Sequence, residues 1–143
     1  MNAISLIIRA SITYFGVVFA FGFLLGAIRI LLLVPILGET LAVLIELPFM
    51  IAISWMVCVR TLDYFSVPEH FFKRLTIGIL ALALLLSAEL LLAIGLFDGS
   101  LQQFLSETKT LPGALGLIGQ GLFALFPILH VNISQIKQAT SSS

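Results

Sequence analysis

The run SITYFGVVFAFGFLLGAIRILLLV at residues 11–34 decides the fold, because Arg29 is its only charged side chain. An α-helix needs roughly 20 apolar residues to cross a hydrocarbon core about 30 Å thick. The run is also longer than the roughly 7–15 apolar residues at the centre of a secretory signal peptide. It therefore predicts a membrane-spanning helix that is retained.

Three more apolar stretches follow, and the segments between them are rich in Pro, Gly, Asp or Ser, as connections are. The stretches are continuous and Leu-rich rather than alternating, which excludes a transmembrane β-barrel. We expect helices at about 8–34, 39–60, 72–97 and 111–131, joined by residues 35–38, 61–71 and 98–110.

Short connections make successive helices antiparallel neighbours. The predicted fold class is therefore all-α, an integral membrane four-helix bundle with up-down-up-down topology. Residues 1–134 form a single transmembrane domain, and the polar residues 135–143 form a frayed C-terminal tail. The last connection places Leu101, Phe104 and Leu105 at helical spacing, which predicts either a short amphipathic helix on the outer leaflet or an ordinary ordered loop.

Composition narrows the classes of function. The 143 residues are 60% hydrophobic and 10% charged, whereas about 25% of the residues of a soluble domain are charged. The formal net charge is zero and the bases are scattered, so the lipid bilayer rather than nucleic acid is the expected partner. The single cysteine, Cys58, excludes an internal disulfide and a multi-cysteine centre, and we expect it to fill space inside a helix.

Orientation follows from the Lys and Arg residues near the ends of the spans. One side of the membrane would carry Arg9, Arg60, Lys73, Arg74 and Lys137, and the other only Lys109. We therefore expect both termini and the connection at 61–71 to be cytoplasmic. Aromatic residues that favour the membrane interface gather at the same side: Tyr14, Trp55, Tyr64, Phe71 and Phe72.

Each predicted span carries one residue that hydrocarbon rejects: Arg29, Glu46, Glu89 and Gln120. With a rise of about 1.5 Å per residue, they lie roughly 8, 10, 12 and 13 Å from the outer ends of their helices, and so at one depth. A charge facing lipid costs about 2.5 kcal/mol or more, so we expect a polar cluster inside the bundle. Glu39 shares a helical face with Glu46 and joins the cluster in this prediction.

Small residues lie beside the polar ones. Gly22 and Gly26 precede Arg29 on one stripe as a Gly-x-x-x-Gly pair, which predicts close approach of another helix. Gly78 and Ala81 lie on the face of Glu89, and Gly113 and Gly116 on the face of Gln120.

Among the four residues at one depth, the guanidinium of Arg29 faces two carboxylates, those of Glu46 and Glu89. The tight turn brings Glu39 and Glu46 near Arg29, whose donors can fork onto one carboxylate and still reach a second. Glu89 lies on the third predicted helix and is less well served by Arg29, so it is the candidate for proton exchange.

Two prolines inside the spans predict kinks, because each removes a backbone donor. Pro48 frees the carbonyl of Leu44, and Pro127 frees that of Phe123. Neither a cofactor nor a metal is predicted: His70 and His130 could approach one another, but His70 lies in a connection and further ligands are scarce.

The residues Gly26-Ala-Ile-Arg29, Pro35, Gly38-Glu39 and Glu46-x-Pro48-x-Met50 resemble a pattern of uncharacterised bacterial inner-membrane proteins with four helices, G-x-x-R, P-x-x-G-E and E-x-P-x-M. The resemblance covers mainly the first two helices. It implies the fold and a multi-pass location in the bacterial inner membrane, and it transfers no catalytic residue.

Two functions are expected from these features. The first is an accessory protein, a compact bundle held by the Arg-Glu-Glu-Gln cluster that docks a larger membrane complex. The second is a proton-coupled transporter or channel for a small solute, which uses Glu89 or Glu46 and would need to form a homodimer to enclose a pathway. An enzyme is the least favoured reading, because no nucleophile or metal motif of a known kind lies in the spans.

Overall fold

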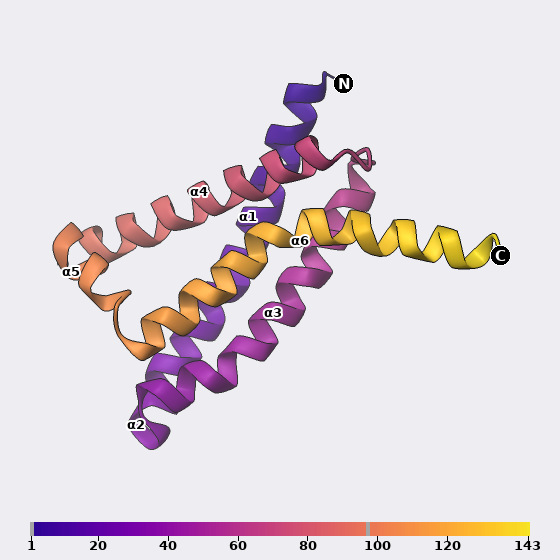
Figure 1. The fold of residues 1–143 in the computed structure, drawn as a ribbon. Coiled ribbons are helices and arrows are strands. Elements are labelled where there is room, and N and C mark those ends of the chain that lie inside the picture. Colours follow the sequence, from indigo (N-terminus) through magenta and orange to yellow (C-terminus); the bar gives the residue numbers. More distant parts are fainter. Residues whose placement is uncertain (1, 97) are drawn as a thin grey trace.

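The computed structural model describes residues 2–96 and 98–143, and every regular element in these ranges is a helix (Figure 1). The elements are α1 (Ala3–Ile28), the π-helical turn η1 (Arg29–Leu33), α2 (Val34–Leu37), α3 (Glu39–Tyr64), α4 (Phe71–Gly95), α5 (Leu101–Glu107) and α6 (Leu111–Ser141). Within the described residues, four continuous helical segments are long and apolar enough to cross a membrane. The all-α prediction and the number of candidate spans are therefore confirmed.

The first span continues through Pro35, which the sequence pattern assigned to a connection. α1, η1 and α2 form one helical segment, Ala3–Leu37, that ends only at Gly38, whose φ of 83° few other residues adopt easily. The ring of Pro35 would clash with the carbonyl of Leu31 in a regular α-helix. The wider π turn at Arg29–Leu33 gives that ring room, so the helix continues where a break was predicted.

Other boundaries also differ from the predicted ones. α6 does not end near residue 131 but continues to Ser141, because Gln, Ile, Lys and Ala in the expected tail are compatible with a helix. α4 ends at Gly95, and the predicted last residue of that span, Phe97, lies outside the described residues, as does Met1 of the predicted domain. The connection after α4 does contain a short helix, α5, which Ser100 begins by accepting a hydrogen bond from the backbone of Gln103.

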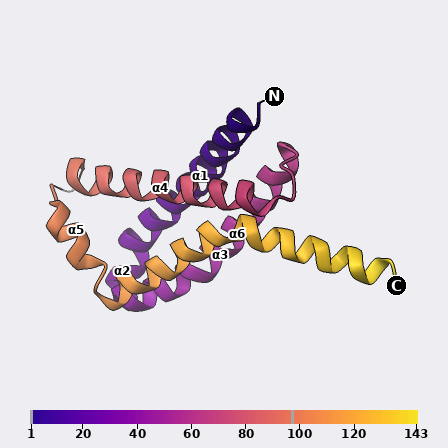
Figure 2. The ribbon, with the colours of Figure 1, turned by 45° about the horizontal axis from the view of Figure 1, so that its top comes forward.

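Each long helix packs against two others. α1 contacts α3 and α4, and α6 contacts the same two helices from the other side. α1 and α4 cross and then diverge, and α4 and α6 separate toward α5 (Figures 1 and 2). The buried core lies away from the ends that diverge, and it contains Ala10, Tyr14, Val18, Cys58, Leu62, Val67, Ile77, Ala81, Leu85, Phe123 and Phe126. The prediction that Cys58 fills space is confirmed, since its side chain is buried in this core.

α6 changes direction part-way along its length, and its C-terminal part projects away from the other helices (Figures 1 and 2). Pro127 lies inside the helix, where proline is the usual cause of such a bend. The carbonyl of Phe123, which Pro127 leaves without a helical donor, accepts a hydrogen bond of 2.6 Å from Tyr14 Oη. The rings of Tyr14 and Phe123 also stack, with centroids 4.3 Å apart. A bond between α1 and α6 thus replaces the one that the proline removes.

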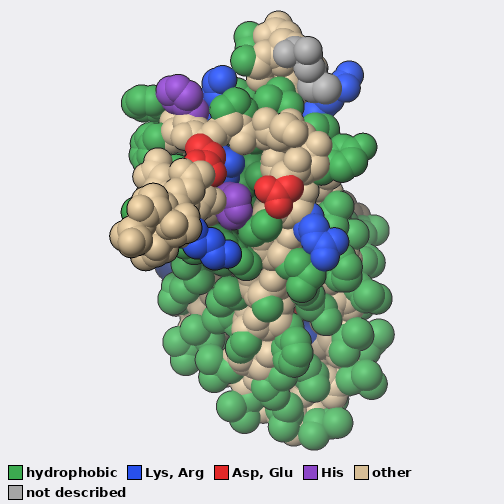
Figure 3. All heavy atoms as spheres, turned by 90° about the vertical axis from the view of Figure 1, so that its right-hand side faces the viewer, with side chains coloured by type: hydrophobic (Ala, Val, Ile, Leu, Met, Phe, Trp, Pro, Cys, Tyr) green, Lys and Arg blue, Asp and Glu red, His purple; other side chains and the backbone are tan. Residues whose placement is uncertain are grey.

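Charged side chains gather toward one end of the face shown in Figure 3, and hydrophobic side chains cover the remainder of that face. The start of α1, the end of α3 and the start of α4 lie together at one end of the molecule (Figure 1). Arg9, Arg60, Lys73 and Arg74 belong to these segments. Many large apolar side chains on the long helices are exposed, including Phe21, Leu31 and Leu91, as lipid-facing residues are.

Candidate functional site

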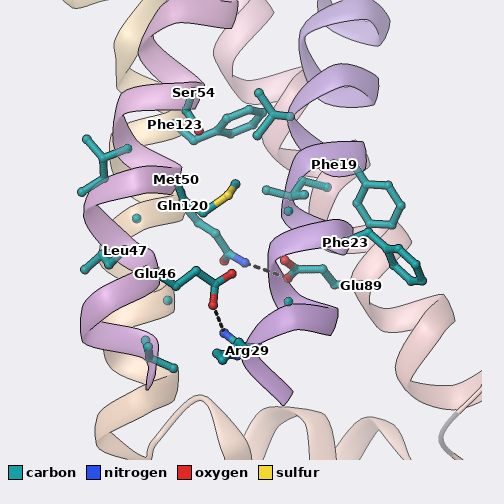
Figure 4. A pocket seen from close by; sticks show the side chains of 18 of the residues that line it. Phe19, Phe23, Arg29, Glu46, Leu47, Met50, Ser54, Glu89, Gln120 and Phe123 are labelled. Carbon is teal, nitrogen blue, oxygen red and sulfur yellow. Dashed lines mark hydrogen bonds and ion pairs between the residues drawn. The ribbon is translucent and has the colours of Figure 1, made fainter. Parts of the chain in front are cut away.

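A cavity of about 400 Å³ lies among α1, η1, α3, α4 and α6 (Figure 4). It begins beside the core residues Val18 and Phe123 and extends along α1 into η1 as far as Ile30. The four polar residues singled out in the sequence, Arg29, Glu46, Glu89 and Gln120, all line it. The structure therefore places them around one space rather than in a close-packed interior.

Arg29 and Glu46 form an ion pair on one side of this cavity. Arg29 begins the π turn, Glu46 lies two turns into α3, and the two side chains meet with an Nη1 to Oε2 distance of 2.7 Å. The Arg29 side chain is 30% exposed and that of Glu46 is 11% exposed. The pair connects the π turn of the first helical segment to α3, and its charges largely cancel at longer range.

Glu89 and Gln120 form a second pair. Gln120 Nε2 on α6 donates to Glu89 Oε2 on α4 over 2.7 Å. Figure 4 shows the Glu89 carboxylate next to the Gln120 amide, with Arg29 joined by a dashed line to Glu46 only. Within the described residues, Arg29 makes an ion pair with Glu46 alone, so the expected fork onto a second carboxylate is not formed. Glu89 instead accepts a hydrogen bond from the neutral amide of Gln120.

The glycines of α1 do not serve the close helix approach predicted for them. A Cβ at Gly26 would have no neighbour within 4 Å, and one at Gly22 would meet only the end of the Met50 side chain. Both glycines line the cavity, as do Gly116 and Gly119 of α6. Because these four residues have no side chain, they leave room for the cavity. Gly78 of α4 is different, because a Cβ there would collide with the backbone carbonyl of Ala124 in α6.

Glu39 does not belong to the cluster. It is the first residue of α3, its side chain is exposed, and it does not line the cavity. Gly38 turns the chain there, so Glu39 lies at the end of the bundle, about two helical turns from Glu46. Pro48 lies inside α3 and is exposed, and the helix is continuous across it.

A second polar centre escaped the sequence pattern. Arg74, counted as a base at the membrane interface, is only 3% exposed. Its guanidinium donates to the carbonyls of Val67 and Pro68 at 3.0 and 3.3 Å, and lies 2.7 Å from His130 Nδ1. These contacts fasten the connection between α3 and α4 to α6. The sequence does contain a hint of these contacts. The loop residues just before Arg74 have backbone carbonyls that need donors, and Arg74 is the nearby side chain with several N–H groups.

His70 and His130 are not partners. His70 is exposed, whereas His130 contacts Arg74 and lies beside Trp55, with ring centroids 6.2 Å apart. Among residues 2–96 and 98–143, the structure brings together no group of three or more His, Cys, Asp or Glu side chains that could hold a metal ion.

No protein-family model, curated protein or solved structure matches this chain. The chemistry of the cavity is therefore the guide to function. Its polar groups are one guanidinium, two carboxylates, an amide and the hydroxyl of Ser54, and apolar side chains form the rest of its wall.

Proposed function

We propose that this chain is a multi-pass protein of the bacterial inner membrane, with its four long helices crossing up-down-up-down and both termini in the cytoplasm. The gathering of Arg9, Arg60, Lys73 and Arg74 at one end supports this orientation. The resemblance of its first two helices to bacterial four-helix inner-membrane proteins supports the location. In this arrangement Lys109 lies outside, and the cavity occupies the outer half of the membrane.

Within that frame, the protein binds a small solute in the cavity and moves it in exchange for a proton on Glu89, with Glu46 held by Arg29. One observation carries this proposal: polar residues from all four long helices line a single space of about 400 Å³. Ligand pockets typically have volumes of about 300–1,000 Å³, mostly apolar walls and a few convergent polar groups. Ionisable residues inside a membrane also mark solute and proton pathways by default.

Proton movement in liposomes tests this function. The protein is reconstituted with a pH-sensitive dye inside, a pH gradient is imposed, and valinomycin with potassium holds the membrane potential at zero. Small organic cations, anions and neutral solutes are supplied outside in turn, because exchange needs a solute to move against the proton. With a solute that it accepts, the wild-type chain should collapse the gradient faster than empty liposomes do. Glu89→Gln should abolish the difference, because it keeps the shape of the side chain and removes the exchangeable proton.

Glu39→Gln is the matched control, since Glu39 has the same side chain and lies outside the cavity. It should behave as the wild type does. Equal rates for wild-type and empty liposomes would contradict proton movement by this protein.

One observation favours a second function, an accessory role in a larger membrane complex. The part of α6 beyond Pro127 projects from the bundle, and its residues Leu129, Ile133 and Ile136 are exposed along one side. This spacing is that of one helical face. Purification of the native protein in a mild detergent decides between the roles: a stoichiometric membrane partner that is lost in an Ile133→Asn variant supports the accessory role, and an isolated chain or homodimer argues against it.

A further inference from the structure

The charges that line the cavity do not balance. Arg29, Glu46 and Glu89 are its charged residues, and their formal charges sum to one negative when both carboxylates are ionised. Arg29 and Glu46 bind each other at 2.7 Å, so each neutralises the other for a ligand. The remaining negative charge belongs to Glu89, whose hydrogen-bond partner, Gln120, is neutral.

Glu89 also has unused capacity. An ionised carboxylate offers about four acceptor positions on its two oxygens. Gln120 occupies one of them, on Oε2, and no hydrogen bond reaches Oε1 from the described residues. Oε1 is nevertheless not sealed off, because within those residues no side-chain oxygen or nitrogen is both inaccessible and without a partner. Glu89 lines the cavity, so a ligand there can approach its carboxylate.

Apolar side chains also lie around Glu89. Phe19 and Phe23 on α1 and Leu92 on α4 line the same cavity, and Figure 4 shows the two phenyl rings on the Glu89 side of it. Aromatic faces attract cations, and aliphatic walls favour an apolar body. With about 30 Å³ for each water-sized group, the cavity holds on the order of a dozen of them.

We propose that the cavity binds an amphiphilic organic cation of about a dozen non-hydrogen atoms, with its charged nitrogen against Glu89 Oε1 and its apolar body between α1 and α4. This inference rests on the proposed function and names the class of its solute. The cation and the proton then compete for one carboxylate. The groups that face Glu89 from the other helices are Arg29 on η1, Glu46 on α3 and Gln120 on α6.

Binding of three small probes to the full chain in dodecyl maltoside micelles tests the inference. The probes are benzyltrimethylammonium, its uncharged isostere neopentylbenzene, and the anion benzenesulfonate, each measured by equilibrium dialysis against empty micelles. The wild-type chain should bind the cation saturably, and at least about 10-fold more tightly than the other two, because only the cation pairs with the carboxylate. This comparison needs no variant and so does not depend on how a mutant folds.

Variants then locate the charge. Glu89→Gln should weaken binding of the cation at least about 10-fold and leave neopentylbenzene binding unchanged. Glu39→Gln, which removes the same charge outside the cavity, should bind the cation as the wild type does. Equal affinity for the cation and its uncharged isostere, or unchanged cation binding by Glu89→Gln, would overturn the inference.

The outcomes also separate the inference from the proposed function. Saturable binding of only the neutral or anionic probe refutes the cationic solute and leaves the cavity as a binding site. Absence of probe binding by a chain that still collapses a pH gradient likewise refutes the inference alone. Absence of both activities refutes both proposals.

Discussion

Tyr14→Phe should destabilise the protein through a carbonyl that Pro127 has freed. The hydroxyl of Tyr14 donates to the Phe123 carbonyl over 2.6 Å, and the Tyr14 side chain is only 1% exposed. Phenylalanine keeps the ring stacked on Phe123 and removes this one bond. The carbonyl then has neither the hydroxyl nor a helical donor, since residue 127 has no N–H.

The expected loss of stability follows from the Phe123 carbonyl being left without a hydrogen-bond donor. Hydrogen bonds between transmembrane helices contribute about 0.6 kcal/mol on average and up to about 1.7 kcal/mol. A buried acceptor left without any partner costs about 1–3 kcal/mol. We therefore expect Tyr14→Phe to lower the free energy of unfolding by about 2 kcal/mol. In a Pro127→Ala background the new N–H of residue 127 serves the carbonyl, so the same change should cost only about 0.6 kcal/mol.

Unfolding of the chain by SDS in mixed micelles measures both costs. Trp55, the only tryptophan, reports on the core because its ring packs edge-on against Phe126 at 5.3 Å. Tyr64→Phe is the matched control, because Tyr64 is 80% exposed and its loss of a hydroxyl should change nothing. Equal costs of Tyr14→Phe with and without Pro127 would refute the idea that the hydroxyl replaces a missing helical bond.

Three further predictions concern packing and the cavity. Gly78→Ala should destabilise the fold by about 1–3 kcal/mol in the same SDS assay, because the new methyl group meets backbone of α6, whereas Gly121→Ala, with open space around it, should be neutral or stabilising. Arg74→Met should cost about 2 kcal/mol and make the connection before α4 sensitive to protease, because the Val67 carbonyl loses its donor and the Pro68 carbonyl keeps only the His70 N–H, and Lys73→Met should have little effect. Gly116→Leu should fill the cavity and abolish probe binding with circular dichroism unchanged, so retained binding would place the probe elsewhere.

The long apolar runs made the helices predictable, since chain that crosses hydrocarbon must satisfy its own backbone hydrogen bonds. Periodicity also placed Glu46, Glu89 and Gln120 on inward faces together with small residues. The ends were less predictable. Pro35 breaks most helices, but a π turn two to six residues earlier can accommodate it, and nothing in the local composition marks that turn.

Contacts between segments far apart in the sequence also could not be predicted from the sequence pattern. Tyr14 was singled out only as an aromatic residue of the membrane interface, and its burial in the core could not be foreseen, because the acceptor it binds is far along the chain on α6. Gly22 and Gly26 fit a motif for close helix contact, yet the helices diverge beside them and the same glycines widen a cavity. A neighbouring helix either packs against a row of glycines or leaves space beside it. Which of these occurs depends on the crossing angles between the helices, and these are set by the packing of the whole bundle.

The cavity ends at Phe123, whose ring is stacked with that of Tyr14 in the packed half of the bundle. A guest molecule that moves along the bundle past this end of the cavity meets the stacked rings. Transport to the opposite side of the membrane would require the stacked rings of Tyr14 and Phe123 to separate. The bend of α6 at Pro127, one helical turn beyond Phe123, is the position at which this part of the cavity wall can move.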